Sequence, residues 1–250
     1  MKVVFIAAGI GARLANITKG LPKPLVDING KSLIERQISL LKKNGINDIL
    51  VITGPYNEKF TIPEIDYLND PEYTEHDQVG SLMVAGTKIQ GDVLILFADI
   101  LFDTAILKQV LASSGDIVIA VDLSWKESYK KRNDNSIAEA DKVAMKNDKI
   151  VRIYKDEKKL DEDYTSIGEF LGIIKLTKTG SKILIEKFEE LEKHHNGGFH
   201  DAASFKKAKI IDLLQELIQS NIQIVPSIIQ GKWCEIDTPN DLVLAKQLFK

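Results

Sequence analysis

The chain has 250 residues, of which 44% are hydrophobic and 28% charged, as in an ordinary globular protein with one large α/β domain or two small ones. The formal net charge of −3 gives no reason to expect nucleic acid or an anionic membrane as a partner. A single cysteine, Cys234, excludes an internal disulfide, and no apolar run approaches the roughly 20 residues that span a bilayer, so we expect a cytoplasmic protein without a signal peptide.

The first thirty residues combine a buried strand with a loop suited to phosphate. The apolar run at residues 3–8 predicts a strand that is covered on both faces, as in a parallel sheet. Gly9 and Gly11 then allow a tight turn, whose free amide groups suit a phosphate chain. Arg13 and Lys23 add two cations, and the prolines on both sides of Lys23 stiffen the backbone there. This stretch predicts a polyphosphate site, with a purely structural glycine turn as the alternative.

The pair of motifs, AAGIGARL at residues 7–14 and LPKPLV at residues 21–26, resembles the signature of the nucleotidyltransferases. These enzymes join an NTP to a sugar phosphate or an alcohol phosphate and release pyrophosphate. A nicotinamide-binding Rossmann site fits less well, because its third glycine would fall at Leu14. The resemblance implies that Arg13 and the glycine loop carry the β- and γ-phosphates, while Lys23 bridges the α-phosphate and the acceptor. It assigns nucleotide binding to Ala7, Ala8, Gly9, Gly11 and Ala12.

A strand–helix–strand unit is expected next, followed by an irregular polar segment. Residues 31–43 have apolar positions at helical spacing, and residues 47–53 predict a second buried strand, which gives a strand–helix–strand unit. Residues 56–80 are polar and are expected to be irregular, with a helix resuming at Ser81. In the nucleotidyltransferases the equivalent loop and helix start hold the base. The matching positions in this chain are Asn69, Gln78, Gly80 and Ser81. The alternative is that this segment is only a solvated loop and that Ser81 caps the helix.

An acidic residue follows the apolar strand expected at residues 92–97. A carboxylate at the end of a buried parallel strand lies at the edge where such sheets bind ligands. Mg²⁺ commonly takes one or two carboxylates together with phosphate oxygens, so Asp99 is the first expected metal ligand, with a helix cap as the alternative. Asp103 is expected to cap the helix that follows.

After the buried strand expected at residues 115–123, the chain is predicted to turn from nucleotide to acceptor. Residues 122–132 mix aromatic, acidic and basic side chains. Aromatic rings beside carboxylates suit an ammonium group, and nearby cations suit a phosphate or phosphonate. The alternative is an exposed amphipathic helix with Trp125 in the core.

An excursion is expected from residue 133 to residue 165, with a hairpin that turns at residues 147–148. A buried strand at residues 169–175 returns to the sheet, and in the nucleotidyltransferases a strand here lines the acceptor pocket. The acceptor-binding candidates are Asp122, Trp125, Tyr129, Arg132 and Glu169.

The end of the chain carries the second motif. Helices are expected at residues 179–194 and 210–220, with a strand at residues 222–229. Nucleotidyltransferases have a Trp-x-x-Ile/Val-Asp-Thr/Ser-x-x-Asp-Leu pattern before their last helix, and WCEIDTPNDL matches it. The resemblance implies that Asp237 is the second metal ligand and meets Asp99 at one Mg²⁺, while Thr238 is expected to cap the final helix.

Together these elements predict an α/β fold, a Rossmann-like three-layer α/β/α arrangement with a mostly parallel mixed central sheet and a small acceptor-binding excursion. We expect one nucleotidyltransferase domain over residues 1–250. Its nucleotide-binding half covers about residues 1–121 and its acceptor-binding part about residues 122–230. Residues 231–250 supply the metal-ligand strand end and the closing helix.

Within the family the resemblance favours the phosphocholine and phosphonate cytidylyltransferases. The chain ends without a left-handed β-helix tail, and Ala98 precedes Asp99 where sugar-phosphate enzymes more often have glycine. The expected reaction is Mg²⁺-dependent transfer of CMP from CTP to phosphocholine, 2-aminoethylphosphonate or a similar acceptor, and a homodimer is compatible with the sequence. Two alternatives stay open: a sugar-1-phosphate nucleotidyltransferase that makes an NDP-sugar, and a non-catalytic nucleotide-binding regulatory module.

Overall fold

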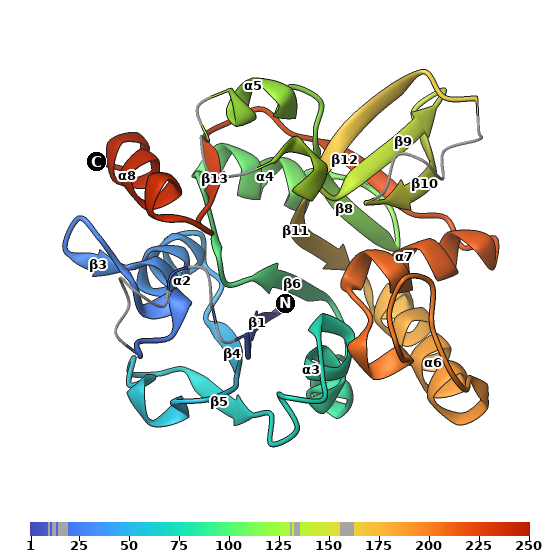
Figure 1. The fold of residues 1–250 in the computed structure, drawn as a ribbon, viewed down its shortest axis with the longest axis horizontal. Coiled ribbons are helices and arrows are strands. Elements are labelled where there is room, and N and C mark those ends of the chain that lie inside the picture. The colour runs from blue at the N-terminus through green and yellow to red at the C-terminus, as the bar shows by residue number, and fades with distance from the viewer. Residues whose placement is uncertain (10, 12–13, 15–19, 131, 133–135, 156–162) are drawn as a thin grey trace.

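The computed structural model describes residues 1–250 except positions 10, 12–13, 15–19, 131, 133–135 and 156–162. Ala12 and Arg13, two of the expected nucleotide ligands, therefore lie outside the described residues. In the described part of the chain, nine strands form one mixed sheet, and helices pack on both of its faces (Figure 1). This arrangement confirms the predicted α/β fold.

The half of the sheet nearest the N-terminus is parallel. Strand β1 (Lys2–Ala7) lies between β4 (Asp48–Thr53) and β6 (Val93–Phe97), and β5 (Asp66–Asn69) adds a parallel edge beside β4. The prediction that residues 56–80 are irregular was wrong at β5. This strand is short, half-exposed and has only two apolar residues, so it lacks the pattern of a buried strand.

The other half of the sheet is organised by the long strand β11 (Ser166–Leu176), which runs antiparallel to β6, β8 (Ile117–Asp122) and β9 (Lys142–Lys146). Strand β8 also pairs in parallel with β12 (Val225–Ile228). The predicted hairpin is confirmed: β9 pairs with β10 (Lys149–Tyr154), and both turn residues, 147 and 148, have positive φ, as a two-residue hairpin turn requires.

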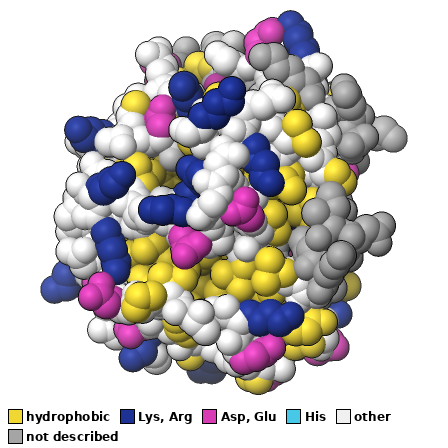
Figure 2. Space-filling model, turned by 90° about the vertical axis from the view of Figure 1, so that its left-hand side faces the viewer, with side chains coloured by type: hydrophobic (Ala, Val, Ile, Leu, Met, Phe, Trp, Pro, Cys, Tyr) yellow, Lys and Arg dark blue, Asp and Glu magenta, His cyan; other side chains and the backbone are white. Residues whose placement is uncertain are grey.

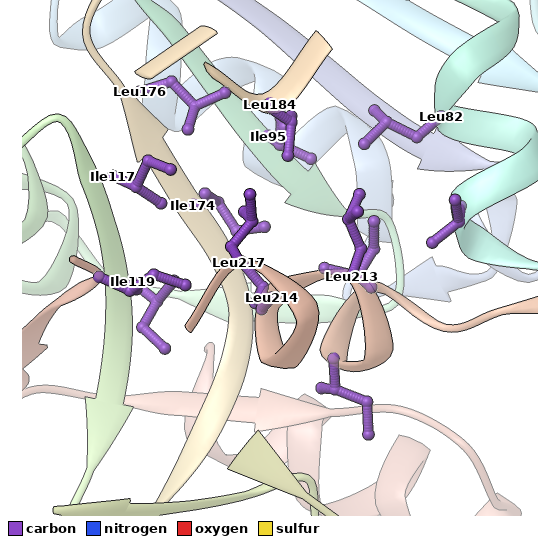
Figure 3. Packing of buried hydrophobic residues seen from close by; sticks show 14 of the residues in the cluster. Leu82, Ile95, Ile117, Ile119, Ile174, Leu176, Leu184, Leu213, Leu214 and Leu217 are labelled. Atoms are coloured by element: carbon purple, nitrogen blue, oxygen red, sulfur yellow. The ribbon is translucent and has the colours of Figure 1, made fainter. Parts of the chain in front are cut away.

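Two apolar layers hold the helices on the sheet. One face packs against α3 (Gln78–Val84), α6 (Lys178–His194) and α7 (Ile210–Gln219). In Figure 3, leucines of α7 point toward β8 and β11. The opposite face packs against α2 (Leu33–Lys43) and α4 (Thr104–Ala112). Asp103 caps α4 as predicted, since its side chain accepts a hydrogen bond from the amide of Ile106.

A third, smaller unit joins the two ends of the chain. Strand β7 (Ile100–Phe102) pairs antiparallel with β13 (Trp233–Glu235), which leads into α8 (Pro239–Leu248), and Thr238 caps this helix as predicted. Beside it lies the small hairpin of β2 (Asp27–Ile28) and β3 (Lys31–Ser32). Figure 2 shows the side of the molecule that carries β3, α2 and α8, where basic, acidic and apolar side chains are interspersed.

The short helix α5 (Trp125–Tyr129) follows β8 and lies near β13 (Figure 1). Of the helices in the described ranges, none has both the length and the apolar character that a membrane span requires.

Candidate active site

A cleft of about 560 Å³ opens where β1 and β6 end. The last residues of both strands line it, as does the N-terminal turn of α3. Carboxyl ends of neighbouring parallel strands meet at one edge of a sheet, which explains why residues from distant parts of the chain meet here. The predicted site residues that line this cleft are Ala7, Ala8, Gly9, Gly11, Lys23, Gln78, Ser81, Asp99 and Asp237.

Three carboxylates converge at this cleft because β7 and β13 pair. Asp99 precedes β7, and the register places Ile100 opposite Glu235. The amide of Ile236 donates to the carbonyl of Asp99 at 2.9 Å and so continues the pairing by one step. As a result, one carboxylate oxygen from each of Asp99, Glu235 and Asp237 lies within 4.8 Å of the other two.

The donor set of this cluster fits a hard divalent cation. All three groups offer carboxylate oxygens, which Mg²⁺ prefers. In addition, Oδ1 of Asp99 is buried and has no hydrogen-bond partner among the described residues. Burial, and after it the nearby charges of Asp237 and Asp99, raise the pKa of Glu235 to about 8. These residues could therefore hold one Mg²⁺ ion.

Lys23 is in contact with two of these carboxylates. Its Nζ donates to Oδ2 of Asp99 at 3.0 Å and also to Oδ1 of Asp237. Burial alone would lower the pKa of Lys23, but the charges of Asp99 and Asp237 outweigh it and raise the pKa above its usual value. The ammonium group is therefore charged at neutral pH.

Gly11 packs directly against Lys23. Gly11 has φ of +61°, and a Cβ there would lie 3.0 Å from Cβ of Lys23. Lys23 itself begins the short helix η2 (Lys23–Leu25), with Pro22 before it and Pro24 at its first turn. Glycine at position 11 thus permits both the turn and the close approach of the lysine.

Arg132, predicted to bind the acceptor, is buried beside the carboxylate cluster. Its Nε donates to Oδ1 of Asp241 at 2.8 Å, and its Nη2 donates to Oε2 of Glu235 at 3.2 Å. Asp241 also accepts the amides of Asp237 and Thr238, at 3.0 and 2.9 Å. Arg132 and Asp241 together thus fix the backbone that presents Asp237.

Two further acceptor candidates form a pair. The hydroxyl of Tyr129 donates to Oε1 of Glu169 at 2.7 Å, while Oε2 of Glu169 is buried without a hydrogen-bond partner in the described structure. Burial raises the pKa of Glu169 to about 7. Glu169 lies directly across from Lys142 and Asp122 in the sheet, so these side chains point to one face.

The remaining two acceptor candidates, Trp125 and Asp122, form hydrogen bonds with other residues of the protein. Trp125 is 1% exposed, and its indole N–H donates to the carbonyl of Ile167 at 3.2 Å, as expected for the alternative in which it belongs to the core. Asp122 accepts from the indole of Trp233 at 2.8 Å and from the amide of Ser124 at 2.7 Å.

A buried network that the sequence did not reveal supports the start of α3. Asp70 is fully buried and accepts hydrogen bonds from the Ser81 hydroxyl at 2.8 Å and the His76 ring at 3.0 Å. The helix begins at Gln78 and is capped by Asp77, so the alternative in which Ser81 caps it was wrong. A buried aspartate in an apparently polar loop gives no local signal of its role.

Three base-binding candidates have different surroundings. Gln78 lines the cleft, and its Oε1 accepts the amide of Ile210 at 2.9 Å. A Cβ on Gly80 would lie 2.6 Å from the ring of His76 and from the carbonyl of Lys206, so this glycine allows close packing. Asn69 is exposed at the end of β5 and does not line the cleft.

Comparison with known proteins adds independent findings. The sequence model of the MobA-like NTP transferase domain matches residues 3–149. The chain is 27% identical to the CTP:phosphoglutamine cytidylyltransferase of Campylobacter jejuni, over 97% of this chain and 98% of that one. It is 30% identical to the choline-phosphate cytidylyltransferase of Streptococcus pneumoniae, over 77% of this chain and 90% of the other.

Solved structures share the fold. The inositol-1-phosphate CTP transferase of T. maritima superposes with a TM-score of 0.73 at 18% identity, covering 99% of this chain and 95% of that one. The CTP:phosphocholine cytidylyltransferase of Streptococcus pneumoniae superposes with a TM-score of 0.71 at 19% identity, covering 100% and 99%. At these identities the likeness concerns the fold alone.

Proposed function

This chain belongs to the MobA-like NTP transferase family, and from that premise we propose that it is a Mg²⁺-dependent cytidylyltransferase. It would transfer CMP from CTP to a small phosphorylated acceptor and release pyrophosphate. The observation that carries the proposal is the contact of Lys23 with Asp99 and Asp237, two members of a cluster of three carboxylates, directly beside Gly11. The names of two relatives that align with most of the chain, both cytidylyltransferases, support the choice of CTP.

The proposed reaction forms a bond between an acceptor oxygen and the α-phosphorus of CTP. The bond between that phosphorus and the bridging oxygen of the β-phosphate breaks, and the electron pair leaves with pyrophosphate. The acceptor phosphate is already anionic at neutral pH, so no side chain has to remove a proton. The difficulty is to bring two polyanions together, and positioning and charge neutralisation therefore dominate the catalysis.

Each group in the cleft has a role in this proposal. Lys23 would bridge the α-phosphate and the acceptor oxygen, and the backbone of the glycine loop would hold the remaining phosphates together with Arg13, which lies outside the described residues. Mg²⁺, held by Asp99, Glu235 and Asp237, would neutralise phosphate charge when bound. The parallel half of the sheet would then serve the nucleotide, and the part from β8 to β12 the acceptor.

The test is a matrix of nucleotides and acceptors. Purified protein is incubated with Mg²⁺, one of CTP, UTP, GTP or dTTP, and one of phosphocholine, a phosphorylated amino acid or a sugar 1-phosphate, and pyrophosphate release is measured. We expect turnover with CTP, and a loss on the order of 10²-fold in Lys23→Met and Asp237→Asn, as for other lost transition-state contacts. The matched control, Lys108→Met on the exposed face of α4, should keep full activity. Preference for a sugar 1-phosphate, or no binding of CTP with Mg²⁺, would refute the proposal.

A further inference from the structure

A second, larger cleft adjoins the first. Its volume is about 900 Å³, and it lies between the β9–β10 hairpin, the short helix η5 (Ile137–Glu139) and the segment that leads into α7. Asp77, which lines the nucleotide cleft, lines this one as well. A ligand in the second cleft would therefore lie beside the proposed CTP site, in the part of the chain that is proposed to bind the acceptor.

The charge of this cleft differs from that of the chain as a whole. The chain has 33 basic and 36 acidic residues, but acidic side chains are the minority in the cleft. Its acidic lining residues are Asp77, Asp201 and Asp212. Its basic lining residues are Lys142, Arg152, Lys155, Lys207 and Lys209. This local excess of positive charge favours an anionic ligand.

Arg152 has hydrogen-bond donors to spare, whereas two of the lysines are paired with acidic residues. Lys155 pairs with Glu139 at 2.8 Å, and Lys207 pairs with Glu75 at 3.4 Å. Arg152 forms no ion pair or side-chain hydrogen bond with any residue that the structure describes, although it is half-buried. Its guanidinium offers five donors in a planar fork that matches a carboxylate.

Lys142 adds a second cation from the adjacent strand. It is 1% exposed, and its Nζ donates to the carbonyl of Lys155 at 2.9 Å. Its Nζ also donates to the carbonyl of Ala140 at 3.4 Å, so hydrogen bonds to the backbone help to hold this buried positive charge in the wall of the cleft. It stands opposite Glu169 in the sheet, which connects this wall to the acceptor side of the site.

A quaternary ammonium group, in contrast, finds no free aromatic face among the described acceptor candidates. The ring of Tyr129 already has Cζ of Arg132 at 5.0 Å from its centroid. The ring of Trp125 has Nζ of Lys126 at 5.5 Å. An ammonium ligand would have to displace these two cations, of which Arg132 is buried and Lys126 is exposed, to gain the same interaction.

We propose that the acceptor is acidic beyond its phosphoryl group: a small phosphate or phosphonate that carries a carboxylate on its remote part, which the second cleft holds through Arg152. This inference rests on the proposed function and narrows its acceptor class. It separates the chain from enzymes whose acceptor presents only an amine or a quaternary ammonium group.

Matched acceptors test the charge preference directly. O-Phosphoserine differs from phosphoethanolamine by one carboxylate, and 2-amino-3-phosphonopropionate differs from 2-aminoethylphosphonate in the same way. With CTP and Mg²⁺, we expect the carboxylated member of at least one pair to have a kcat/KM roughly 10-fold or more above its partner, as for one charge-assisted hydrogen bond. Equal values in both pairs, or a preference for the amines or phosphocholine, would overturn the proposal.

Two variants on the same strand test whether Arg152 causes the preference for the carboxylated acceptors. Arg152→Met should bring the ratio within each pair close to one while leaving KM for CTP unchanged. Lys149→Met removes an exposed cation from the same strand β10 outside the cleft and should keep the ratio. If the ratio survives Arg152→Met, the assignment of the cleft is wrong.

A binding measurement separates this inference from the proposed function. Calorimetric titration of O-phosphoserine and phosphoethanolamine into the wild-type protein, with CTP and Mg²⁺ omitted, measures the carboxylate preference without turnover. If no acceptor supports release of pyrophosphate, the proposed function fails. Tighter binding of the carboxylated compound, together with the loss of this preference in Arg152→Met, would still show that the cleft binds anions. Equal binding of the two compounds to the wild-type protein would overturn the inference.

Discussion

Replacing Arg132 with methionine tests whether this arginine holds the three carboxylates of the proposed metal site in place. The substitution keeps an extended side chain but removes the guanidinium group, whose nitrogens lie 2.8 Å from Asp241 and 3.2 Å from Glu235. Removing one partner of a buried ion pair costs about 3–5 kcal/mol. In a protein of this size each kcal/mol lowers Tm by about 2–4 °C, so we expect Tm to fall by roughly 6–20 °C.

Thermal unfolding of the wild-type and variant proteins measures this change, and the Mg²⁺ concentration for half-maximal pyrophosphate release should rise because Asp237 loses its support. Lys130→Met is the control, since Lys130 pairs with Glu127 on the surface and such pairs are worth at most about 1 kcal/mol. The double variant Arg132→Met/Asp241→Asn should recover part of the lost stability, because the buried negative charge that Arg132 had neutralised is removed as well. An unchanged Tm in Arg132→Met would refute the reasoning.

Three further single substitutions have predicted effects. Gly11→Ala should raise KM for CTP and lower kcat, because φ of +61° and the 3.0 Å approach to Lys23 strain any side chain; unchanged kinetics would contradict this. Ser81→Ala should lower the unfolding free energy by about 1–3 kcal/mol in urea titrations, since buried Asp70 loses a donor. The variant Glu169→Gln should become more stable relative to wild type as the pH rises from about 4.5 to 7. Burial raises the pKa of Glu169 to about 7, so the folded wild type binds more protons than the unfolded wild type in this pH range and loses stability as the pH rises. Parallel curves of unfolding free energy against pH for the two proteins would contradict this.

The local parts of the fold were predictable because local chemistry determines them. The turn at residues 147–148, the Asp103 cap and the Thr238 cap depend on residues next to each other in the chain, and the structure confirms all three. Buried strands such as β1 and β8 were equally predictable, because a short continuous apolar run between turn residues is typical of a buried strand. Strand β5 was missed because an exposed edge strand does not need such a run.

The site itself was only partly predictable, because its geometry depends on the register between distant segments. Glu235 was part of a recognised motif, but nothing in its neighbourhood shows that β13 pairs with β7 and brings it to Asp99. Trp125 and Arg132 were predicted from composition, and composition does not say which face of a short helix is buried. The sequence left the core alternative for Trp125 open, and the structure places this residue there.

The contacts of Arg132 join the two sides of the proposed reaction. From the segment after β8 it reaches the carboxylates of Glu235 and Asp241, and its guanidinium lies over the ring of Tyr129. Tyr129 in turn donates to Glu169 on β11. Because buried charges in such a chain are costly unless each one is paired, a shift at one member changes the stability of the others. Tyr129, Glu169 and Arg132 are therefore joined to Glu235 in one buried polar network, which would couple the proposed acceptor side to the proposed metal site.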